Sequence, residues 1–332
     1  MAIDTMVNSG FCAVAVVLML GPAAVFAEKA DDAASFPTRP IRIVVGFTPG
    51  GQPDIYARLI AIKLTEALHQ QVVVDNRPGA GGVIGTQIVV GANPDGHTLL
   101  SVSSAHVSSP AVHARLPYDT AKDLAGITLT ATATYLLVVP PTLGVTTVQE
   151  FIALAKSRPG QLNFSSAGTG SGTHFAGEML KQSANIDVVH IPYKGIPESL
   201  TDTMTGRVQF TMAPIASSVT FVKEGRLRVL GVSSKKRSAI YPDIPTIAES
   251  GLPGFEWDSW GGLLAPAKTS RAVITKLNRE ITRALLLPDV EQRLRALGAE
   301  PVPSTPAEFD KFIVEQLRVV AQLAKKAGIN AQ

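Results

Sequence analysis

The chain has 332 residues, a length typical of two domains, and 45% of them are hydrophobic, which is enough for real buried cores. The net charge is only +3 at neutral pH, which favours small anionic molecules over nucleic acid as partners. The one cluster of three adjacent basic residues is Lys235-Lys236-Arg237. No aromatic platform accompanies that cluster, so we interpret it as a solvated turn.

Residues 1–27 have the pattern of an export signal. Phe11–Leu20 is an unbroken run of apolar and small residues that is too short to span a bilayer as a helix. Val25-Phe26-Ala27 then offers small residues at the positions of a cleavage site, so cleavage is expected after Ala27. Residues 28–35 are polar and Ala-rich, and we expect them to form a flexible leader.

Removal of this signal would change the chemistry that is open to the chain. The only cysteine, Cys12, lies inside the signal, so the exported protein would have no disulfide, thiol nucleophile or Cys-based metal site. Asp4 is the only charged residue in the signal, so its loss would raise the net charge from +3 to +4.

Strands and helices alternate along the first part of the exported chain. Ile41–Phe47 is an apolar run typical of a strand buried on both faces, and Val72–Val74 and His97–Val102 continue the pattern. Helices are expected after the Gly50-Gly51 turn and over Val83–Gly91. The apolar stripe of the first helix is assigned to Ile55, Leu59, Ile62 and Leu68. This alternation predicts an open α/β sheet with right-handed crossovers.

A second domain is expected to follow. Leu129–Val139 is a long β-rich run without charge, and we expect it to cross into that domain, which repeats the alternation of strands and helices. The Gly-, Pro- and Trp-rich stretch Gly251–Pro266 is expected to cross back. Three amphipathic helices would then pack on the first domain, over Ser270–Leu287, Val290–Leu297 and Ala307–Ala327.

Two crossings predict a hinged α/β fold with two doubly wound lobes. Lobe 1 is expected to comprise residues 36–134 and 258–332, and lobe 2 residues 135–257. Trp257 and Trp260 lie at the return crossing, where they either pack the hinge or stack against a ligand. The charge count gives no reason to expect a stable oligomer, so a monomer is expected.

Three glycine-rich turns lie between an expected strand and an expected helix: Phe47–Asp54, Asn76–Gly85 and Ala167–Thr173. Such turns occupy the carboxyl edge of an open α/β sheet, where ligands bind. Glycine lets a ligand approach the backbone closely, and each helix start presents unpaired N–H groups and a positive dipole end. The pattern predicts an anion site between the lobes, best suited to a molecule with two acidic ends. The alternative is that the glycines only make tight turns.

Catalytic motifs fail when their spacing is checked. Gly79–Thr86 lacks the Lys of a phosphate loop, and Ile84 occupies the place of the last glycine in G-x-G-x-x-G. Ser171 and His174 lie in one helix start without a third orienting group, so a Ser-based hydrolase is the weaker interpretation.

The six histidines show no metal-ligand spacing. His106 and His113 stand apart on a stretch that has the character of a loop, and neither has a carboxylate neighbour in the sequence. We expect structural roles for both, and we expect no catalytic residue, metal ion or cofactor.

Six ordered motifs go beyond a generic α/β pattern. They are Pro49-Gly50-Gly51-x-x-Asp54-x-x-Ala57-Arg58, Asn76-Arg77-Pro78-Gly79-Ala80-Gly81-Gly82-x-Ile84-Gly85, Pro94-Asp95-Gly96-His97-Thr98-Leu99-Leu100, Leu116-Pro117-Tyr118-Asp119, Ser165-Ser166-Ala167-Gly168-Thr169-Gly170-Ser171-Gly172-Thr173-His174, and His190-Ile191-Pro192-Tyr193-Lys194-Gly195. With these motifs the chain, from about Phe36 to Leu323, resembles the Bug family, the periplasmic solute-binding proteins of tripartite tricarboxylate transporters (the TctC type).

The resemblance implies a Venus-flytrap fold of periplasmic binding protein type II, which closes on a carboxylated solute. In this family the first two Gly-rich loops hold one carboxylate, partly through ordered waters. Carried over, that grip falls on Phe47, Gly50, Gly51, Asp54, Ala80, Gly81 and Gly82. The second lobe selects the rest of the ligand, and the residues implied there are Ser166, Gly168, Thr169, Gly170 and Thr173. Ser103 and Ser104 end the third strand and are expected to face the cleft as well.

Three departures from the family pattern bear on the ligand. Gln52-Pro53 stands where small residues usually follow the Gly pair, and Gly172 stands where a bulkier residue is common. Pro214 lies in a region where many members carry an Asp that can meet the ammonium of an amino acid. The missing Asp, together with an apolar wall expected from Thr211–Ala213, favours a dicarboxylate or an aromatic carboxylate.

The expected function is capture of a small carboxylated acid in the periplasm for the membrane subunits of a tripartite tricarboxylate-type transporter. Two alternatives stay open, a secreted ester hydrolase that uses Ser171 and a ligand-binding co-receptor for a sensor kinase. An envelope protein with an inert cleft is a third. No nucleic-acid partner is expected under any of them.

Overall fold

The computed structural model describes Met1, residues 34–326, 329 and 331. Apart from Met1, the signal expected at residues 1–27 and its cleavage site lie outside the described residues, as does most of the leader expected at 28–35. Within the described part, no helix combines the length and the apolar composition that crossing a bilayer requires.

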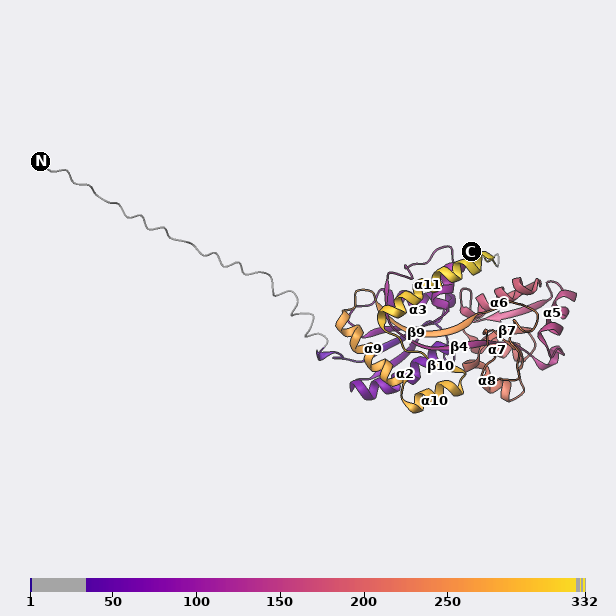
Figure 1. Cartoon of the computed structure of the whole chain (residues 1–332), viewed down its shortest axis with the longest axis horizontal. Coiled ribbons are helices and arrows are strands. Elements are labelled where there is room, and N and C mark those ends of the chain that lie inside the picture. Colours follow the sequence, from indigo (N-terminus) through magenta and orange to yellow (C-terminus); the bar gives the residue numbers. More distant parts are fainter. Residues whose placement is uncertain (2–33, 327–328, 330, 332) are drawn as a thin grey trace.

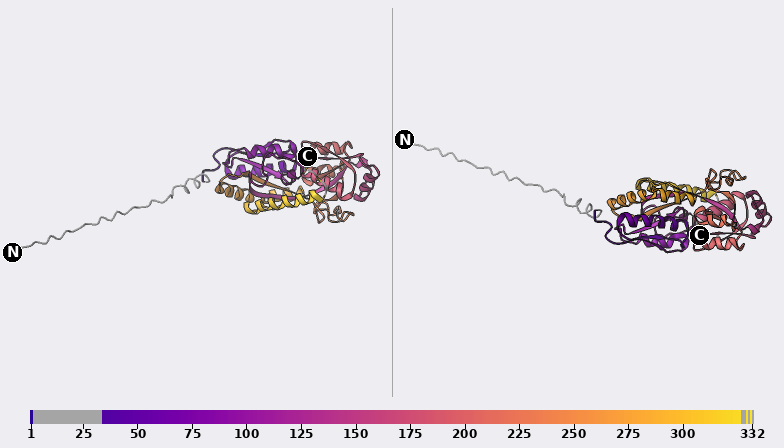
Figure 2. Two further views of the ribbon diagram at one scale, coloured as in Figure 1. Left: turned by 90° about the horizontal axis from the view of Figure 1, so that it is seen from above. Right: turned by 90° about the horizontal axis from the view of Figure 1, so that it is seen from below.

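Two lobes lie side by side along the long axis of the molecule (Figure 1, Figure 2). The N-terminal and C-terminal parts of the chain, in indigo and in orange to yellow, form one lobe. The middle of the chain, in magenta to pink, forms the other. The α/β fold class expected from the alternation of strands and helices is confirmed.

The first lobe is built around three parallel strands with helices between them. Its elements before the second lobe are β1 (Ile41–Val45), α2 (Gln52–Leu68), β2 (Val72–Asn76), η1 (Ala80–Gly82), α3 (Val83–Val90), β3 (Thr98–Ser103) and α4 (Ala105–Val112). Those after it are β9 (Asp258–Pro266), α9 (Arg271–Leu285), α10 (Pro288–Ala296), β10 (Ala299–Pro301) and α11 (Pro306–Lys326). β1 pairs in parallel with β2 and β3, and β9 lies antiparallel beside β3.

The second lobe follows the long strand β4 (Leu124–Val139). Its other elements are η2 (Pro141–Leu143), α5 (Val148–Ser157), β5 (Leu162–Ser166), α6 (Gly172–Ala184), β6 (Val188–Pro192), α7 (Ile196–Met204), β7 (Phe210–Pro214), α8 (Ile215–Lys223) and β8 (Arg228–Val232). β5 is parallel to both β6 and β7, and β4 runs antiparallel to β7 and β8.

Strand β4 belongs to both lobes. Its first part pairs with β9 up to the Thr134–Asp258 pair, and its second part pairs with β7 from the Tyr135–Pro214 pair onward. The described strands thereby form one continuous sheet of ten strands. The change of partners between Thr134 and Tyr135 places the junction of the two lobes on this strand.

Both faces of the sheet are buried. On β4, Leu136 and Val138 belong to one hydrophobic cluster, whereas Tyr135, Leu137 and Val139 belong to the other. This division follows from the alternation of side chains along a strand. Each of the two clusters contains residues of both lobes, so the sheet carries two cores rather than one. Because helices cover both faces, the strands consist of nearly continuous apolar residues.

The structure corrects the stripe assigned to α2. Ile62 is 59% exposed, while Ile55, Leu59 and Leu68 are only partly buried. The helix instead buries a face that contains Tyr56, Ala57, Ile60, Ala61 and Leu64. The helix carries large aliphatic residues on more than one face, and the predicted stripe left out Ile60 and Leu64, which lie with Ala57 and Ala61 on the face that packs against the rest of the lobe.

The loop assigned to His106 and His113 is also wrong. This stretch forms α4, with His106 buried inside the helix and His113 at its C-cap. Its sequence is rich in Ser and contains Pro110, and both residue types disfavour a helix interior. The helix contacts α11, a partner that local sequence does not reveal.

Candidate ligand-binding site

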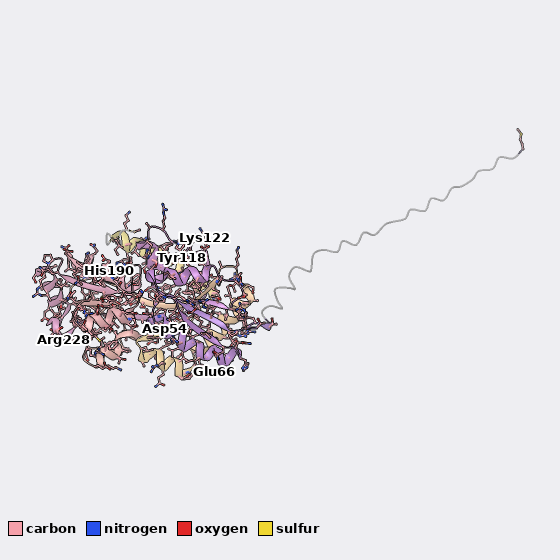
Figure 3. The ribbon with its side chains drawn as sticks, turned by 180° about the vertical axis from the view of Figure 1, so that it is seen from behind. Asp54, Glu66, Tyr118, Lys122, His190 and Arg228 are labelled. Atoms are coloured by element: carbon pink, nitrogen blue, oxygen red, sulfur yellow. The ribbon has the colours of Figure 1, made fainter. Side chains whose placement is uncertain are left out.

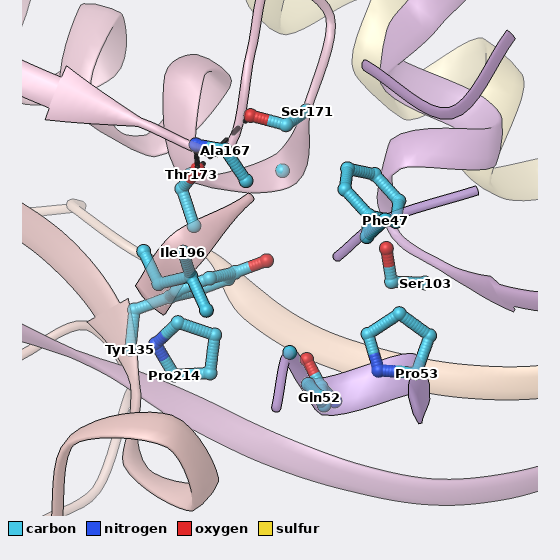
Figure 4. A pocket seen from close by; sticks show the side chains of 12 residues that line it. Phe47, Gln52, Pro53, Ser103, Tyr135, Ala167, Ser171, Thr173, Ile196 and Pro214 are labelled. Atoms are coloured by element: carbon cyan, nitrogen blue, oxygen red, sulfur yellow. Dashed lines mark hydrogen bonds between the residues drawn. The ribbon is translucent and has the colours of Figure 1, made fainter. Parts of the chain in front are cut away.

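A cavity of about 30 Å³ lies between the lobes beside the hinge (Figure 4). It is lined by Phe47, Gly51, Gln52, Pro53, Ser103, Tyr135, Ala167, Ser171, Gly172, Thr173, Ile196 and Pro214. None of these lining residues carries a charged side chain, and their polar groups are hydroxyls and one carboxamide. A volume of this size holds about two water molecules, so an acid of several carbons can enter only if the lobes move apart.

Four helices begin at this cavity. The N-caps of α2, α6 and α8 are Gly51, Ser171 and Pro214, and the first residue of α7 is Ile196. All four residues line the cavity. The first N–H groups of a helix have no partner in that helix, and they carry the positive end of its dipole. Helix starts of this kind are a general means by which proteins hold anions, and four of them border this uncharged cavity.

Asp54 joins the first two glycine-rich turns and does not line the cavity. Figure 3 labels this residue near the middle of the molecule. Its carboxylate accepts hydrogen bonds from Gly50 N at 2.9 Å, from Arg58 Nε at 3.0 Å and from Asn76 Nδ2 at 2.9 Å. Asn76 also donates to the carbonyl of Phe47 at 3.0 Å. Burial raises the pKa of Asp54, but the hydrogen bonds from Arg58, Gly50 and Asn76 outweigh it and hold the pKa below its usual value.

The second glycine-rich turn borders a separate cavity of about 20 Å³ in the first lobe. Gly81 and Gly82 line it, and Phe47 and Ser103 line both cavities. Gly81 and Gly82 have φ angles of 63° and 103°, in the region that favours glycine. The turn therefore brings its backbone close to Phe47 without facing the larger cavity directly.

The two lobes are in contact around these turns. A Cβ placed on Gly81 would lie 2.0 Å from the carbonyl oxygen of Thr169. Thr48 Oγ1 donates to Glu198 Oε2 at 3.0 Å, and Ser108 Oγ on α4 donates to the carbonyl of Gly170 at 2.8 Å. These contacts bring all three glycine-rich turns to the junction of the lobes, in a closed arrangement.

Two stacked histidines hold the third turn from behind. His174 Nδ1 accepts a hydrogen bond from Gly170 N at 3.2 Å, and the His190 ring bonds the Ser166 hydroxyl at 2.7 Å. The two ring centroids are 4.0 Å apart. Burial, helped by the nearby His113, lowers the pKa of His174 to about 4. Burial, helped by His174, lowers the pKa of His190 to about 3, so both rings are neutral at neutral pH.

Ser171 has the contacts of a helix cap. Its Oγ accepts a hydrogen bond from His174 N at 3.2 Å and shares one with Thr173 Oγ1 at 2.9 Å. The ring of His174 is bonded to Gly170 N, so it does not pair with Ser171 as a base pairs with a nucleophile. Among the described residues, no group of three or more His, Cys, Asp or Glu side chains could hold a metal ion.

The two tryptophans of the return crossing pack the hinge. Trp257 lies 4.7 Å from Phe175 between ring centroids, and its Nε1 donates to the carbonyl of Gly172. Trp260 packs edge-on against Phe309. Both tryptophans are at most 4% exposed, and neither lines the cavity. Of the two roles considered from the sequence, they therefore have the packing role.

The residues expected at the site fall into three groups. Those that line the larger cavity are Phe47, Gly51, Ser103 and Thr173. Those that line the smaller one are Phe47, Gly81, Gly82 and Ser103. Those that line neither are Gly50, Asp54, Ala80, Ser104, Ser166, Gly168, Thr169 and Gly170. The apolar wall expected from Thr211, Met212 and Ala213 is wrong, because all three are fully buried in the second lobe and only Pro214 reaches the cavity.

Two lining residues, Tyr135 and Ile196, lie outside the three turns and were not expected. A sequence pattern could have predicted that Ile196 lies at the site. Gly195-Ile196-Pro197-Glu198 repeats the pattern of Gly51-Gln52-Pro53-Asp54, a glycine N-cap followed by proline and an acidic residue in the first turn. The two helix starts face each other, since a Cβ on Gly50 would lie 3.5 Å from Pro197.

Two α/β lobes that close on a cavity at a shared hinge define a periplasmic binding protein of the type II Venus-flytrap class. The model of the TctC family, described as "Tripartite tricarboxylate transporter family receptor", matches residues 56–329. The chain is 40% identical to the "UPF0065 protein in tcbD-tcbE intergenic region" of Pseudomonas sp. (strain P51), over 84% of this chain and 83% of that protein. It is 35% identical to Protein BugT of Bordetella pertussis, over 89% of this chain and 91% of BugT.

Solved structures agree with this assignment. Rpa4515 of Rhodopseudomonas palustris with adipate has a TM-score of 0.87 and 34% identity, covering 90% of this chain and all of that one. MatC (Rpa3494) of the same species with bound malate has a TM-score of 0.84 and 31% identity, covering 87% of this chain and all of that one. The chain therefore belongs to the TctC family of solute-binding receptors, and the expected family and fold are confirmed.

Proposed function

We propose that this protein captures a dicarboxylate in the periplasm and delivers it to the membrane subunits of a tripartite tricarboxylate-type transporter, without catalysing a reaction. The observation that carries the proposal is the cavity at the starts of α2, α6, α7 and α8, which no charged side chain lines. Backbone N–H groups and hydroxyls would hold the ligand, and nothing in such a lining breaks a bond.

The magnitudes support binding by these groups. Each hydrogen bond to a charged group contributes about 1.5–3 kcal/mol, and each helix dipole about 0.3–1 kcal/mol. A micromolar complex needs roughly −8 kcal/mol in total. A few first-turn N–H groups of α2 and α6, together with burial of the ligand's carbon chain against Phe47, Ile196 and Pro214, reach that value.

The lining favours a second oxygen-bearing end over an ammonium. The lining residues include no Asp or Glu that could meet a positive charge, and the four helix starts would repel one. Two relatives of similar structure were solved with adipate and with malate, both of which are dicarboxylates. An aromatic dicarboxylate such as terephthalate presents the same two ends and belongs in the same screen.

The test is a thermal-shift and calorimetric screen of mono-, di- and aromatic carboxylates and amino acids, on protein that has been unfolded and refolded to strip any ligand that co-purified. A ligand at 100 times its Kd should add about 2.7 kcal/mol to the free energy of unfolding. Stabilisation by an amino acid alone would exclude the proposed ligand class, and no stabilisation at all would refute solute capture.

An uptake assay distinguishes delivery to a transporter from signalling through a sensor kinase. Vesicles that contain the membrane subunits should accumulate labelled ligand only when the loaded protein is added. Binding without such uptake, together with ligand-dependent activation of a kinase, would favour the co-receptor. Mass spectrometry of the mature protein would test export, with cleavage expected after Ala27.

A further inference from the structure

One lining residue has an unsatisfied polar group. The Gln52 side chain is only 2% exposed, and it belongs to the first turn of α2. Its Oε1 accepts a hydrogen bond from Ser259 Oγ, whereas its Nε2 has no hydrogen-bond partner among the described residues. A buried donor without an acceptor is unfavourable, because its hydration has been lost without replacement.

The position of Gln52 places this unpaired donor at the wall of the cavity between the lobes. The residue lines the cavity, and Figure 4 shows it below Tyr135 and Ile196 on the side opposite Ser171 and Thr173. The other polar side chains of the lining are hydroxyls, which can turn to donate or to accept. Among the lining side chains Gln52 is the one that carries an amide N–H, and Ser259 holds the other end of that amide, while the Tyr56 hydroxyl lies beside it one turn along α2.

We propose that Gln52 is a specificity-determining residue whose Nε2 donates to an oxygen atom of the ligand's second polar group. This inference rests on the proposed function, since it assumes that the cavity binds a carboxylate. It makes the second group a carboxylate, a carbonyl or a hydroxyl, and it disfavours an ammonium, whose N–H groups would meet the N–H groups of Gln52.

The experiment compares ligand pairs of equal length that differ only in the second carboxylate. The pairs are succinate and butyrate, glutarate and pentanoate, adipate and hexanoate, and terephthalate and 4-methylbenzoate. The Kd of each is measured by calorimetry for the wild-type protein and for Gln52→Met, which keeps the length of the side chain but removes the donor. Gln87→Met on α3, where the side chain is exposed, is the matched control.

Gln52→Met should weaken the preferred dicarboxylate about 10- to 100-fold and leave its monocarboxylate partner within a few-fold, so the ratio of the two affinities falls. Gln52→Glu keeps an acceptor for Ser259 but puts a carboxylate against the ligand, so it should lower the ratio further. This second variant also decides the matter if Gln52→Met does not fold.

An unchanged ratio in Gln52→Met or Gln52→Glu, when the wild type binds the dicarboxylate, would overturn the inference and leave the proposed function intact. Gln52 would then be a structural partner of Ser259 and of Tyr56, whose hydroxyl also lacks a partner one turn along α2. If the wild type binds no carboxylate in the panel, the proposed function fails, and the inference fails with it.

Discussion

A single methyl group at Gly172 should prevent the lobes from closing as the structure shows them. Gly172 is the first residue of α6, and a Cβ placed on it would lie 2.2 Å from Ser104 Oγ and 2.4 Å from Tyr135 OH. These two hydroxyls are hydrogen-bonded to each other at 2.8 Å and are buried, so they cannot simply move into solvent. The added methyl group would therefore make α6 of the second lobe collide with Ser104, which follows β3 of the first lobe.

The cost of the clash can be worked from this geometry. Overpacking a buried site by one methyl group destabilises it by about 1–3 kcal/mol. The open arrangement separates α6 from Ser104 and is spared this contact, so Gly172→Ala should shift the equilibrium toward open lobes. Since each 1.4 kcal/mol is a factor of ten, the Kd of every ligand should rise about 5- to 150-fold.

Isothermal titration calorimetry measures the change in Kd, and small-angle scattering measures the opening through the radius of gyration. Gly91→Ala is the matched control, because a Cβ there would meet its nearest neighbour at an ordinary 3.6 Å. Combining Gly172→Ala with Ser104→Ala and Tyr135→Phe removes both obstructing oxygens. This triple variant should bind ligand nearly as well as the double variant Ser104→Ala, Tyr135→Phe, which keeps Gly172.

Wild-type affinity in Gly172→Ala would refute the reasoning, because the contact between α6 and Ser104 would then be absent from the bound state. The reasoning would also be refuted if the triple variant bound ligand as weakly as Gly172→Ala does. The loss of affinity would then come from a change in the backbone of α6 and not from the clash with the two hydroxyls.

Three further variants test other parts of the site. Asp54→Asn should cost about 1–3 kcal/mol in urea unfolding and weaken ligand binding, because it removes the charge that Arg58 and the two glycine-rich turns share; unchanged stability would count against that role. His174 has its pKa lowered to about 4, so between pH 6.5 and 4 the unfolded chain binds a proton that the folded protein does not, and stability should fall as the pH falls. His174→Asn, which retains an acceptor but does not titrate, should flatten part of that fall, and an identical pH profile would contradict the assignment. Gly81→Leu should abolish ligand binding, because its Cβ would lie 2.0 Å from the Thr169 carbonyl and its φ is 63°; retained binding would show that this contact is dispensable.

Local sequence predicted most of the fold. The strand β1, the helix start at Pro53 and the turn at Gly81 follow from apolar runs, from proline near the first helical position and from glycine, each of which acts within a few residues. The same local signals indicated that helix starts, and not reactive side chains, would form the site. The family motifs pointed to the same class of protein.

The lining of the cavity could not be derived in this way. Tyr135, Ile196 and Pro214 come from different strands and helices, and only the pairing of β4 with β7 and the closing of the lobes bring them to one place. Apolar periodicity likewise misplaced the buried face of α2, and a Ser- and Pro-rich sequence concealed α4.

The sequence by itself determined the alternation of strands and helices, the glycine-rich turns at helix starts and the family, because these depend on backbone preferences and on motifs that are contiguous in the chain. Only the tertiary structure decided that four helix starts share one uncharged cavity, that Asp54 supports the turns from behind, and that Gln52 is left with a free donor. The physical reason is that packing between distant segments, which no local preference specifies, sets which groups face the cavity and which ones satisfy each other.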